Sequence, residues 1–188
     1  LNFVNFKVDI KKGEKLSFFD FLKRHKFLIP YGILVFSILL GDSGISTFLP
    51  VKSKGLGLEK FALFFSVFSF STLISRIVFG RYFKNFLFKI LVFSGAIFIF
   101  FNHILLFLLK DYLLLILSGI FYGIGFAFFE SNMLPFLSSK VSFEEKGYAV
   151  SFYSFFFDLG YFIGPMFLGF SADIFGVSSV FLVSSVFI

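Results

Sequence analysis

Long apolar runs fill most of the chain, and short polar or glycine-containing breaks separate them. Lipid offers no partner to unpaired backbone groups, so such runs must be helical. They are too continuous for the alternating strands, about ten residues long, of a membrane barrel. Crossing a bilayer takes about 20 residues in a helix. Six runs fit or nearly fit that length, the last cut short by the end of the sequence: 27–49, 61–79, 86–109, 112–137, 148–168 and 177–188. The pattern predicts an all-α integral membrane fold, a bundle of six transmembrane helices.

Residues 1–26 differ from the rest because they are rich in lysine. We predict a basic loop here, with an amphipathic helix over residues 17–26 on the membrane face. With six spans, the loops alternate between two sides, and the positive-inside rule places the more basic side in the cytoplasm. The pattern therefore predicts a multi-pass cell-membrane protein whose residues 1–26 are cytoplasmic. Of the 17 Lys and Arg residues, only four fall on the other side: Lys52, Lys54, Lys60 and Lys110.

Composition excludes several classes of protein. Apolar residues make up 58% and charged residues 15%, against about 45–50% and 25% in soluble domains. A soluble fold and intrinsic disorder are both excluded. The net charge of +6 fits basic loops beside anionic lipid, so we expect no nucleic acid as partner. The chain has no cysteine and two histidines without metal-site spacing, so we expect no metal or cofactor.

Two motifs point to a known family. Residues 76–81 read R-I-V-F-G-R, and residues 158–169 read D-L-G-Y-F-I-G-P-M-F-L-G. Together they resemble the C-terminal half of a major facilitator superfamily (MFS) transporter. The first is similar to the loop between its eighth and ninth helices, and the second to the Gly-Pro helix motif of its antiporters. One departure is that Lys84, Asn85 and Leu87 stand where the loop motif has Asp, Arg and Gly.

The resemblance implies a function and an architecture. It implies an MFS-type half with a 3+3 inverted repeat, preceded by the central loop of residues 1–26 and by an N-terminal six-helix half of the same chain. It implies a secondary active transporter that exports or exchanges a small molecule by alternating access, with protons as the coupling ion. The substrate would bind between the two halves.

Three acidic residues lie inside predicted spans. Asp42 is late in the first, Glu130 is late in the fourth, and Asp158 is near the middle of the fifth. A carboxylate in lipid is costly, so each should face the bundle interior or water. A carboxyl shielded from water can take up and release protons. We predict proton coupling or substrate binding, with Asp158 the leading candidate, while carboxylates satisfied within the bundle are the structural alternative.

A second set of residues suggests gating and helix packing. Small residues four apart let helix backbones approach closely, and proline bends a membrane helix. Arginines near a helix end are commonly interface anchors; Arg76 has the alternative of holding an acid of a neighbouring helix. The candidates are Arg76, Gly80, Arg81, Gly160, Gly164, Pro165 and Gly169.

Two other functions compete with transport. Residues 41–44 read G-D-S-G, which contains the G-x-S-G of rhomboid-type intramembrane serine proteases, with His103 as the potential base. Such matches are common in Gly/Ser-rich spans, and Asn102 and His103 more simply read as residues of the outer interface. A non-transporting membrane scaffold is the remaining alternative. We expect a transporter and not an enzyme.

Overall fold

The computed structural model describes residues 17–83 and 87–188, with residues 81–83 by backbone only. This part of the chain is helical and contains no strand. Its elements, in chain order, are α1 (Phe18–Arg24), η1 (Lys26–Leu28), α2 (Ile29–Gly55), α3 (Ala62–Phe83), α4 (Phe88–Phe107), α5 (Tyr112–Ser139), η2 (Phe143–Glu145), α6 (Lys146–Phe175) and α7 (Val177–Val186). The basic residues 1–16 and the loop residues 84–86, including Lys84 and Asn85, lie outside the described residues.

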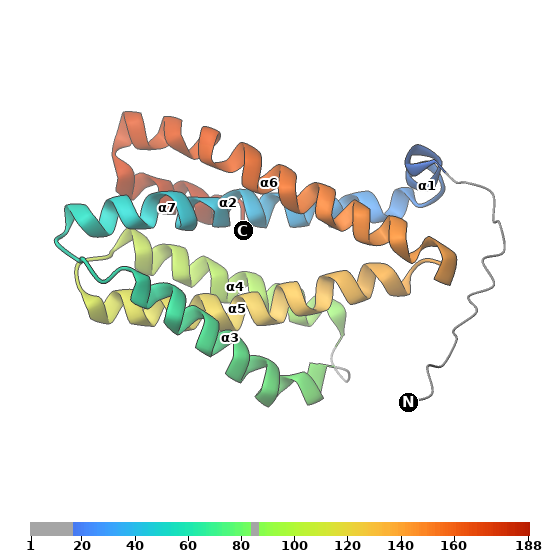
Figure 1. The fold of residues 1–188 in the computed structure, drawn as a ribbon, viewed down its shortest axis with the longest axis horizontal. Helices are drawn as coiled ribbons and strands as arrows, with labels where there is room; N and C mark the ends of the chain where they lie inside the picture. The colour runs from blue at the N-terminus through green and yellow to red at the C-terminus, as the bar shows by residue number, and fades with distance from the viewer. Residues whose placement is uncertain (1–16, 84–86) are drawn as a thin grey trace, which may run out of the picture.

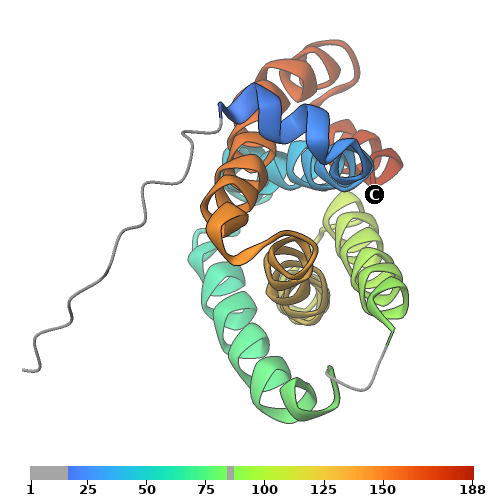
Figure 2. The ribbon, with the colours of Figure 1, turned by 90° about the vertical axis from the view of Figure 1, so that its right-hand side faces the viewer.

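Helices α2 to α6 are each long and apolar enough to cross a membrane, and α7 is a shorter apolar helix. The predicted all-α membrane bundle is therefore confirmed. Figure 1 shows its helices in two layers, with α2, α6 and α7 in one and α3, α4 and α5 in the other. The strongest packing is between α4 and α5, between α2 and α6, and between α3 and α5. Viewed from the end, α3 lies on the outside of the bundle beside α5 (Figure 2).

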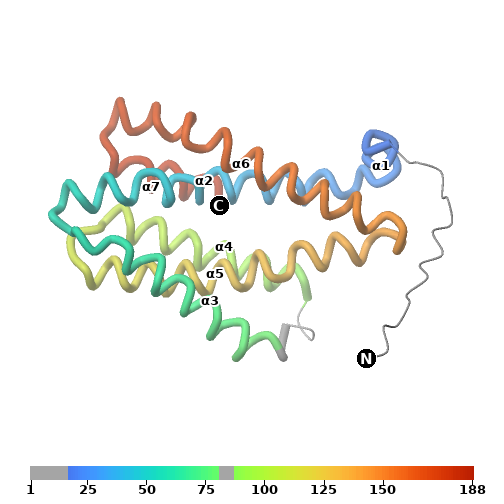
Figure 3. The backbone as a smooth tube through the Cα atoms, in the orientation of Figure 1, coloured from blue at the N-terminus to red at the C-terminus, as the bar shows by residue number. Residues whose placement is uncertain are grey.

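The pairing of helices follows the order of two three-helix units. Exchanging α2, α3 and α4 for α5, α6 and α7 maps the α2–α6 contact onto the α5–α3 contact. The same exchange maps the α2–α7 contact onto the α5–α4 contact. This correspondence is the one expected for a 3+3 repeat. The tube in Figure 3 shows α5 alongside α3 and α4. Helix α5 thus contacts two helices of the first unit, and α2 contacts α6 and α7 of the second unit.

Three helices continue well past the ends that their apolar runs predict. Helix α2 continues through Pro50 to Gly55, α3 through Gly80 to Phe83, and α6 through Gly169 to Phe175. Neighbouring helices can compensate for proline and glycine within a membrane helix, so none of these residues ends its helix. Helix α6 ends only at Gly176, whose φ of +85° suits glycine. As a consequence Asp42 lies at the middle of α2. The sequence-based prediction of a position late in the span is therefore wrong.

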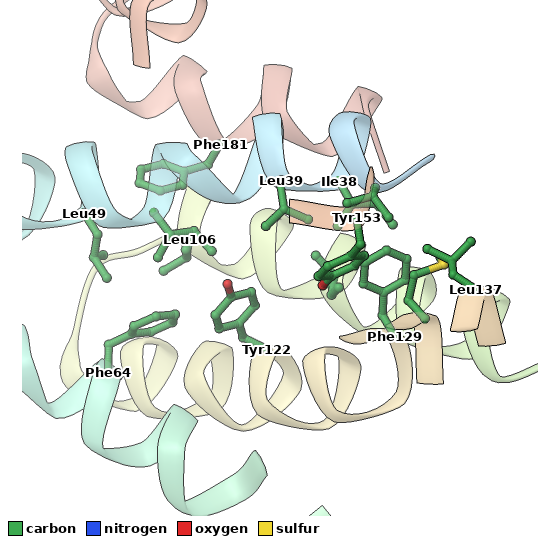
Figure 4. Packing of buried hydrophobic residues seen from close by; sticks show 14 of the residues in the cluster. Ile38, Leu39, Leu49, Phe64, Leu106, Tyr122, Phe129, Leu137, Tyr153 and Phe181 are labelled. Carbon is green, nitrogen blue, oxygen red and sulfur yellow. The ribbon is translucent and has the colours of Figure 1, made fainter. Parts of the chain in front are cut away.

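Glycines bring α5 close to both neighbours in its layer. A Cβ atom on Gly125 would lie 2.8 Å from the Gly95 carbonyl oxygen of α4. A Cβ atom on Gly123 would lie 2.7 Å from the Phe68 carbonyl oxygen of α3. Large side chains fill the space between the two layers, among them Leu39, Leu106, Phe129 and Phe181, all shown in Figure 4.

Helix α1 is docked on the start of α6. The Phe21 ring is fully buried and stacks on Tyr148, with 5.5 Å between the ring centroids. Arg24 and His25 contact the two Glu145 carboxylate oxygens at 3.3 and 3.2 Å. Burial raises the pKa of Glu145, but hydrogen bonds from Ser142 and His25 outweigh burial and leave that pKa below its ordinary value. These contacts fix α1 to the bundle itself.

Candidate functional site

The interior of the bundle contains a carboxyl group at the middle of α2. Asp42 is only 1% exposed. Both of its carboxyl oxygens lack a hydrogen-bond partner among the described residues. The nearest ionisable nitrogen is His103 Nε2 on α4, 4.0 Å from Asp42 Oδ1. Burying a carboxyl without hydrogen bonds is costly, which makes Asp42 a candidate for a functional residue.

His103 is held on α4 by contacts on both sides of its ring. Its Nδ1 lies 2.9 Å from the Ile99 carbonyl oxygen, and its Nε2 lies 3.4 Å from the Gly41 carbonyl oxygen. Both His103 and Asn102 are fully buried, so their assignment to the outer interface is wrong. His103 faces Gly41 and Asp42 at the middle of α2, and α7 packs on α4 as well, so this part of α4 lies inside the bundle.

Three tyrosines connect Asp42 with a second acidic residue. The Tyr122 hydroxyl faces Asp42 and interacts with Tyr161, although the geometry at the carboxyl falls short of a hydrogen bond. Tyr153 interacts electrostatically with both Tyr161 and Glu130, but its buried hydroxyl has no hydrogen-bond partner among the described residues. Figure 4 shows Tyr122 pointing from α5 into the core, with Tyr153 further along the same interior. The three hydroxyls add to the buried polar groups of Asp42, Asn102 and His103.

Glu130 itself is paired with Arg76. Arg76 Nη2 donates to Glu130 Oε2 at 2.8 Å, which joins α3 to α5. Both side chains are partly exposed, at 48% and 31%. They line an open pocket of about 390 Å³ together with Gly80, Ser131 and Pro135. Arg76 therefore binds an acidic residue of a neighbouring helix, as in the second of the two alternatives for this residue. It also lies near the end of α3.

Asp158 lies near the middle of α6 and is exposed on the surface of the described bundle. Ser151, Ser154 and Phe155, one and two turns before it, are also exposed. Phe162, one turn after it, is 72% exposed. Residues three, four and seven apart share one face of a helix. The exposed face of α6 thus carries two serines in the first half of the helix and a carboxyl near its middle, between the exposed rings of Phe155 and Phe162. We call Ser151, Ser154 and Asp158 the α6 polar face.

The other side of α6 packs closely on α2. A Cβ atom on Gly160 would lie 2.9 Å from the Phe36 carbonyl oxygen, and one on Gly164 would lie 2.7 Å from the Leu40 carbonyl oxygen. Gly169 has more space, with its nearest neighbour 4.0 Å away. Pro165 lies inside the helix without ending it. Arg81 belongs to α3, but its side chain is outside the described residues.

The protease geometry is not assembled. A serine nucleophile must lie within hydrogen-bond reach of its base. The Ser43 hydroxyl instead donates to the Leu40 carbonyl oxygen at 2.7 Å and faces Gly164 of α6. His103 faces Gly41 and Asp42 from α4. The structure thus gives the rhomboid-type reading no support.

Three buried or partly buried tyrosines near Asp42 and Glu130 are not among the site residues predicted from the sequence. Tyr122, Tyr153 and Tyr161 lie inside spans whose usual aromatic residue is phenylalanine, with 38 Phe against 7 Tyr in the chain. A hydroxyl is costly in an apolar core unless it has a polar partner. Tyrosine at a mid-span position was therefore a usable signal, and the eight-residue spacing of Tyr153 and Tyr161 places both near one face of α6.

Comparison with known proteins agrees with this architecture. No curated protein and no solved structure matches the chain. A family model described as Major Facilitator Superfamily matches residues 31–188, from the start of α2 to α7. The match covers all five candidate membrane spans and the shorter α7, except for the first residues of the first span. The chain therefore belongs to the Major Facilitator Superfamily of transporters, as a helical half bundle of a multi-pass membrane protein.

Proposed function

We propose that this chain is half of a proton-coupled secondary transporter that exports or exchanges a small cationic or amphipathic molecule by alternating access. The other half is an N-terminal six-helix bundle of the same protein, in the cell membrane, with residues 1–26 in the cytoplasm. The α6 polar face around Asp158 carries this proposal.

A carboxylate at the middle of a membrane helix is costly in lipid and is found facing protein or a water-filled cavity. The described bundle does not cover Asp158. The polar face therefore needs a protein surface or water opposite it, which is the environment between two halves of a transporter. A carboxyl there is within reach of a substrate and of protons. Asp158 is accordingly the first residue that we assign to coupling.

Asp42 is the second coupling candidate, because it is buried without hydrogen bonds. Tyr122 and Tyr161 interact with it, and Tyr153 interacts electrostatically with Tyr161 and Glu130. With water completing the connection at the unpartnered Tyr153 hydroxyl, these residues support a proton route between the core and the pocket at Arg76 and Glu130. We assign the Arg76–Glu130 pair to a gate at that end of the bundle, with Gly80 at the edge of the pocket. We assign the glycines of α6 to the contact surface along which α2 and α6 move against each other.

Reconstituted full-length protein tests the proposal. Proteoliposomes carry a pH gradient and ethidium, a lipophilic cation whose movement is followed by fluorescence. Asp158→Asn should abolish pH-driven ethidium movement, while protein yield and melting temperature stay unchanged. Asp173→Asn is the matched control, because Asp173 is an exposed acid near the end of the same helix. Unchanged transport by Asp158→Asn would remove Asp158 from the mechanism.

A triple variant separates transport from the scaffold alternative. Neutralising Asp158, Asp42 and Glu130 together should stop proton flux as well as ethidium movement. If wild-type protein shows no proton flux above empty vesicles with any tested cation, and the triple variant equals it, the scaffold reading replaces the proposal. Asp42→Asn alone should weaken coupling without changing ethidium binding.

A further inference from the structure

A buried ammonium group lies at the end of the bundle remote from α1. Lys52 of α2 is 7% exposed. Its Nζ donates to the carbonyl oxygens of Leu106 and Phe107, at 2.8 and 2.7 Å, where α4 ends. The same atom lies 5.8 and 5.4 Å from the ring centroids of Phe107 and Phe181. These contacts hold the ammonium in place but carry only partial negative charge.

The ammonium lacks a counter-ion. In the part of the chain that the structure describes, the ion pairs involve Glu145, Glu130 and Asp42, and no carboxylate lies within 4.0 Å of Lys52. The two adjoining loops each carry one acid: Glu59 is exposed and forms no ion pair among the described residues, and Asp111 accepts from the Leu114 amide at 2.9 Å. An ammonium has three N–H donors, and the two carbonyls use two. A buried charge is costly unless it is paired, so the third donor indicates an anionic partner.

A pocket of about 610 Å³ opens beside this group. Lys110 also lines it, and its other walls are largely apolar, including Val51, Leu56, Leu108 and Val177. The pocket lies where α2 and α4 end and α7 begins, at the level of a membrane interface. Ammonium groups beside apolar walls at this level match a molecule with an anionic head and a hydrocarbon tail.

We propose that this pocket binds the phosphate headgroup of an anionic phospholipid from the adjacent leaflet. Lys52 contacts the phosphate at the inner end of the pocket, and Lys110 contacts it from the rim. One acyl chain runs along the apolar wall of Val51, Leu56 and Val177. The bound lipid neutralises the buried ammonium and ties α2, α4 and α7 together. The site is separate from the α6 polar face and does not depend on the proposed transport.

Thermal unfolding of the full-length protein in detergent, with and without phosphatidylglycerol, tests this site. The lipid should raise the melting temperature of wild-type protein. Lys52→Gln should reduce the lipid affinity about tenfold, as expected for one charge-assisted contact. Lys54→Gln is the matched control, because Lys54 is exposed on the same helix and does not line this pocket. It should respond as wild type does.

A second variant keeps Lys52 and fills the pocket. Ser178 is exposed and lines it, so Ser178→Phe should abolish the lipid response, and this test holds even if Lys52→Gln does not fold. A wild-type response in either variant would overturn the proposal and leave Lys52 as a cap for α4. An equal shift with inorganic phosphate alone would overturn the lipid assignment in favour of a soluble anion.

Discussion

The close crossing of α2 and α6 makes Gly164→Ala a sharp test of the packing. The added Cβ atom would meet the Ser43 hydroxyl and lie 2.7 Å from the Leu40 carbonyl oxygen. The carbonyl belongs to the backbone of α2, so a side-chain rotation alone cannot relieve the clash. The Ser43 hydroxyl also donates to that carbonyl oxygen at 2.7 Å, so the extra methyl disturbs the hydrogen bond as well.

The expected cost follows from these contacts. Inserting a methyl group into a close-packed site costs about 1–3 kcal/mol, and losing the hydrogen bond adds about 1 kcal/mol. Alanine is the better helix former by about 1 kcal/mol in water, which offsets part of this. The net loss in free energy of unfolding should be roughly 1–3 kcal/mol, from the same ranges.

Gly169→Ala is the matched control, because its nearest neighbour is Phe48 Cζ at 4.0 Å. It should be neutral or stabilising in the same denaturant titration in detergent. Combining Gly164→Ala with Ser43→Gly should recover part of the loss, because the hydroxyl is then absent. If Gly164→Ala is as stable as Gly169→Ala, α2 and α6 are not in close contact at Gly164, and the packing described above is wrong.

Three further predictions concern other contacts. Arg76→Gln and Glu130→Gln should each cost under about 1 kcal/mol of unfolding free energy, because the pair is partly exposed, yet raise ethidium leak through the gate; an unchanged leak contradicts the gate. The pKa of Glu145 is lower in the folded protein than its ordinary value, so the ionised carboxylate stabilises the docking of α1 at any pH above that ordinary value. This stabilisation is lost as the pH falls through the lowered pKa. Protection factors for amide hydrogen exchange over residues 18–24, corrected for the intrinsic exchange rate at each pH, should therefore fall on acidification, and a Glu145→Gln variant should show no such change. His103→Ala should cost roughly 2–4 kcal/mol in denaturant unfolding, as for truncating a large buried side chain, and a loss below 1 kcal/mol would contradict its burial.

Much of the fold follows from the sequence because lipid restricts the choices. Runs of apolar residues must be helices, and their number and order predict the bundle. Helix ends are less predictable, because proline and glycine end helices in water but persist inside membrane helices. Pro50, Gly80 and Gly169 are such residues here. The error over Pro50 placed Asp42 late in its predicted span, whereas it lies at the middle of α2.

The candidate site is only partly readable from one sequence. Acids inside spans stand out by their cost, which is why Asp158, Asp42 and Glu130 are all recognisable. Their surroundings depend on which helices meet. The pairing of Glu130 with Arg76 joins residues 54 positions apart, and nothing in the spacing fixes that choice. The hydroxyls beside Asp42 come from two other helices and require the packing of α5 and α6 on α2.

The most direct test of the central claim is whether water reaches the α6 polar face inside the membrane. The chain contains no cysteine, so Ser154→Cys supplies a unique label site within it, in full-length protein freed of other reactive cysteines. Ile97→Cys at the middle of α4 is the control, because Ile97 is 40% exposed and its exposed neighbours Phe93, Phe100 and Phe101 are apolar. We expect a membrane-impermeant maleimide to label Ser154→Cys in proteoliposomes, ethidium to slow the labelling, and Ile97→Cys to stay unlabelled. Equal lack of labelling at both positions, in both directions of the pH gradient, would contradict a water-filled transport pathway along α6.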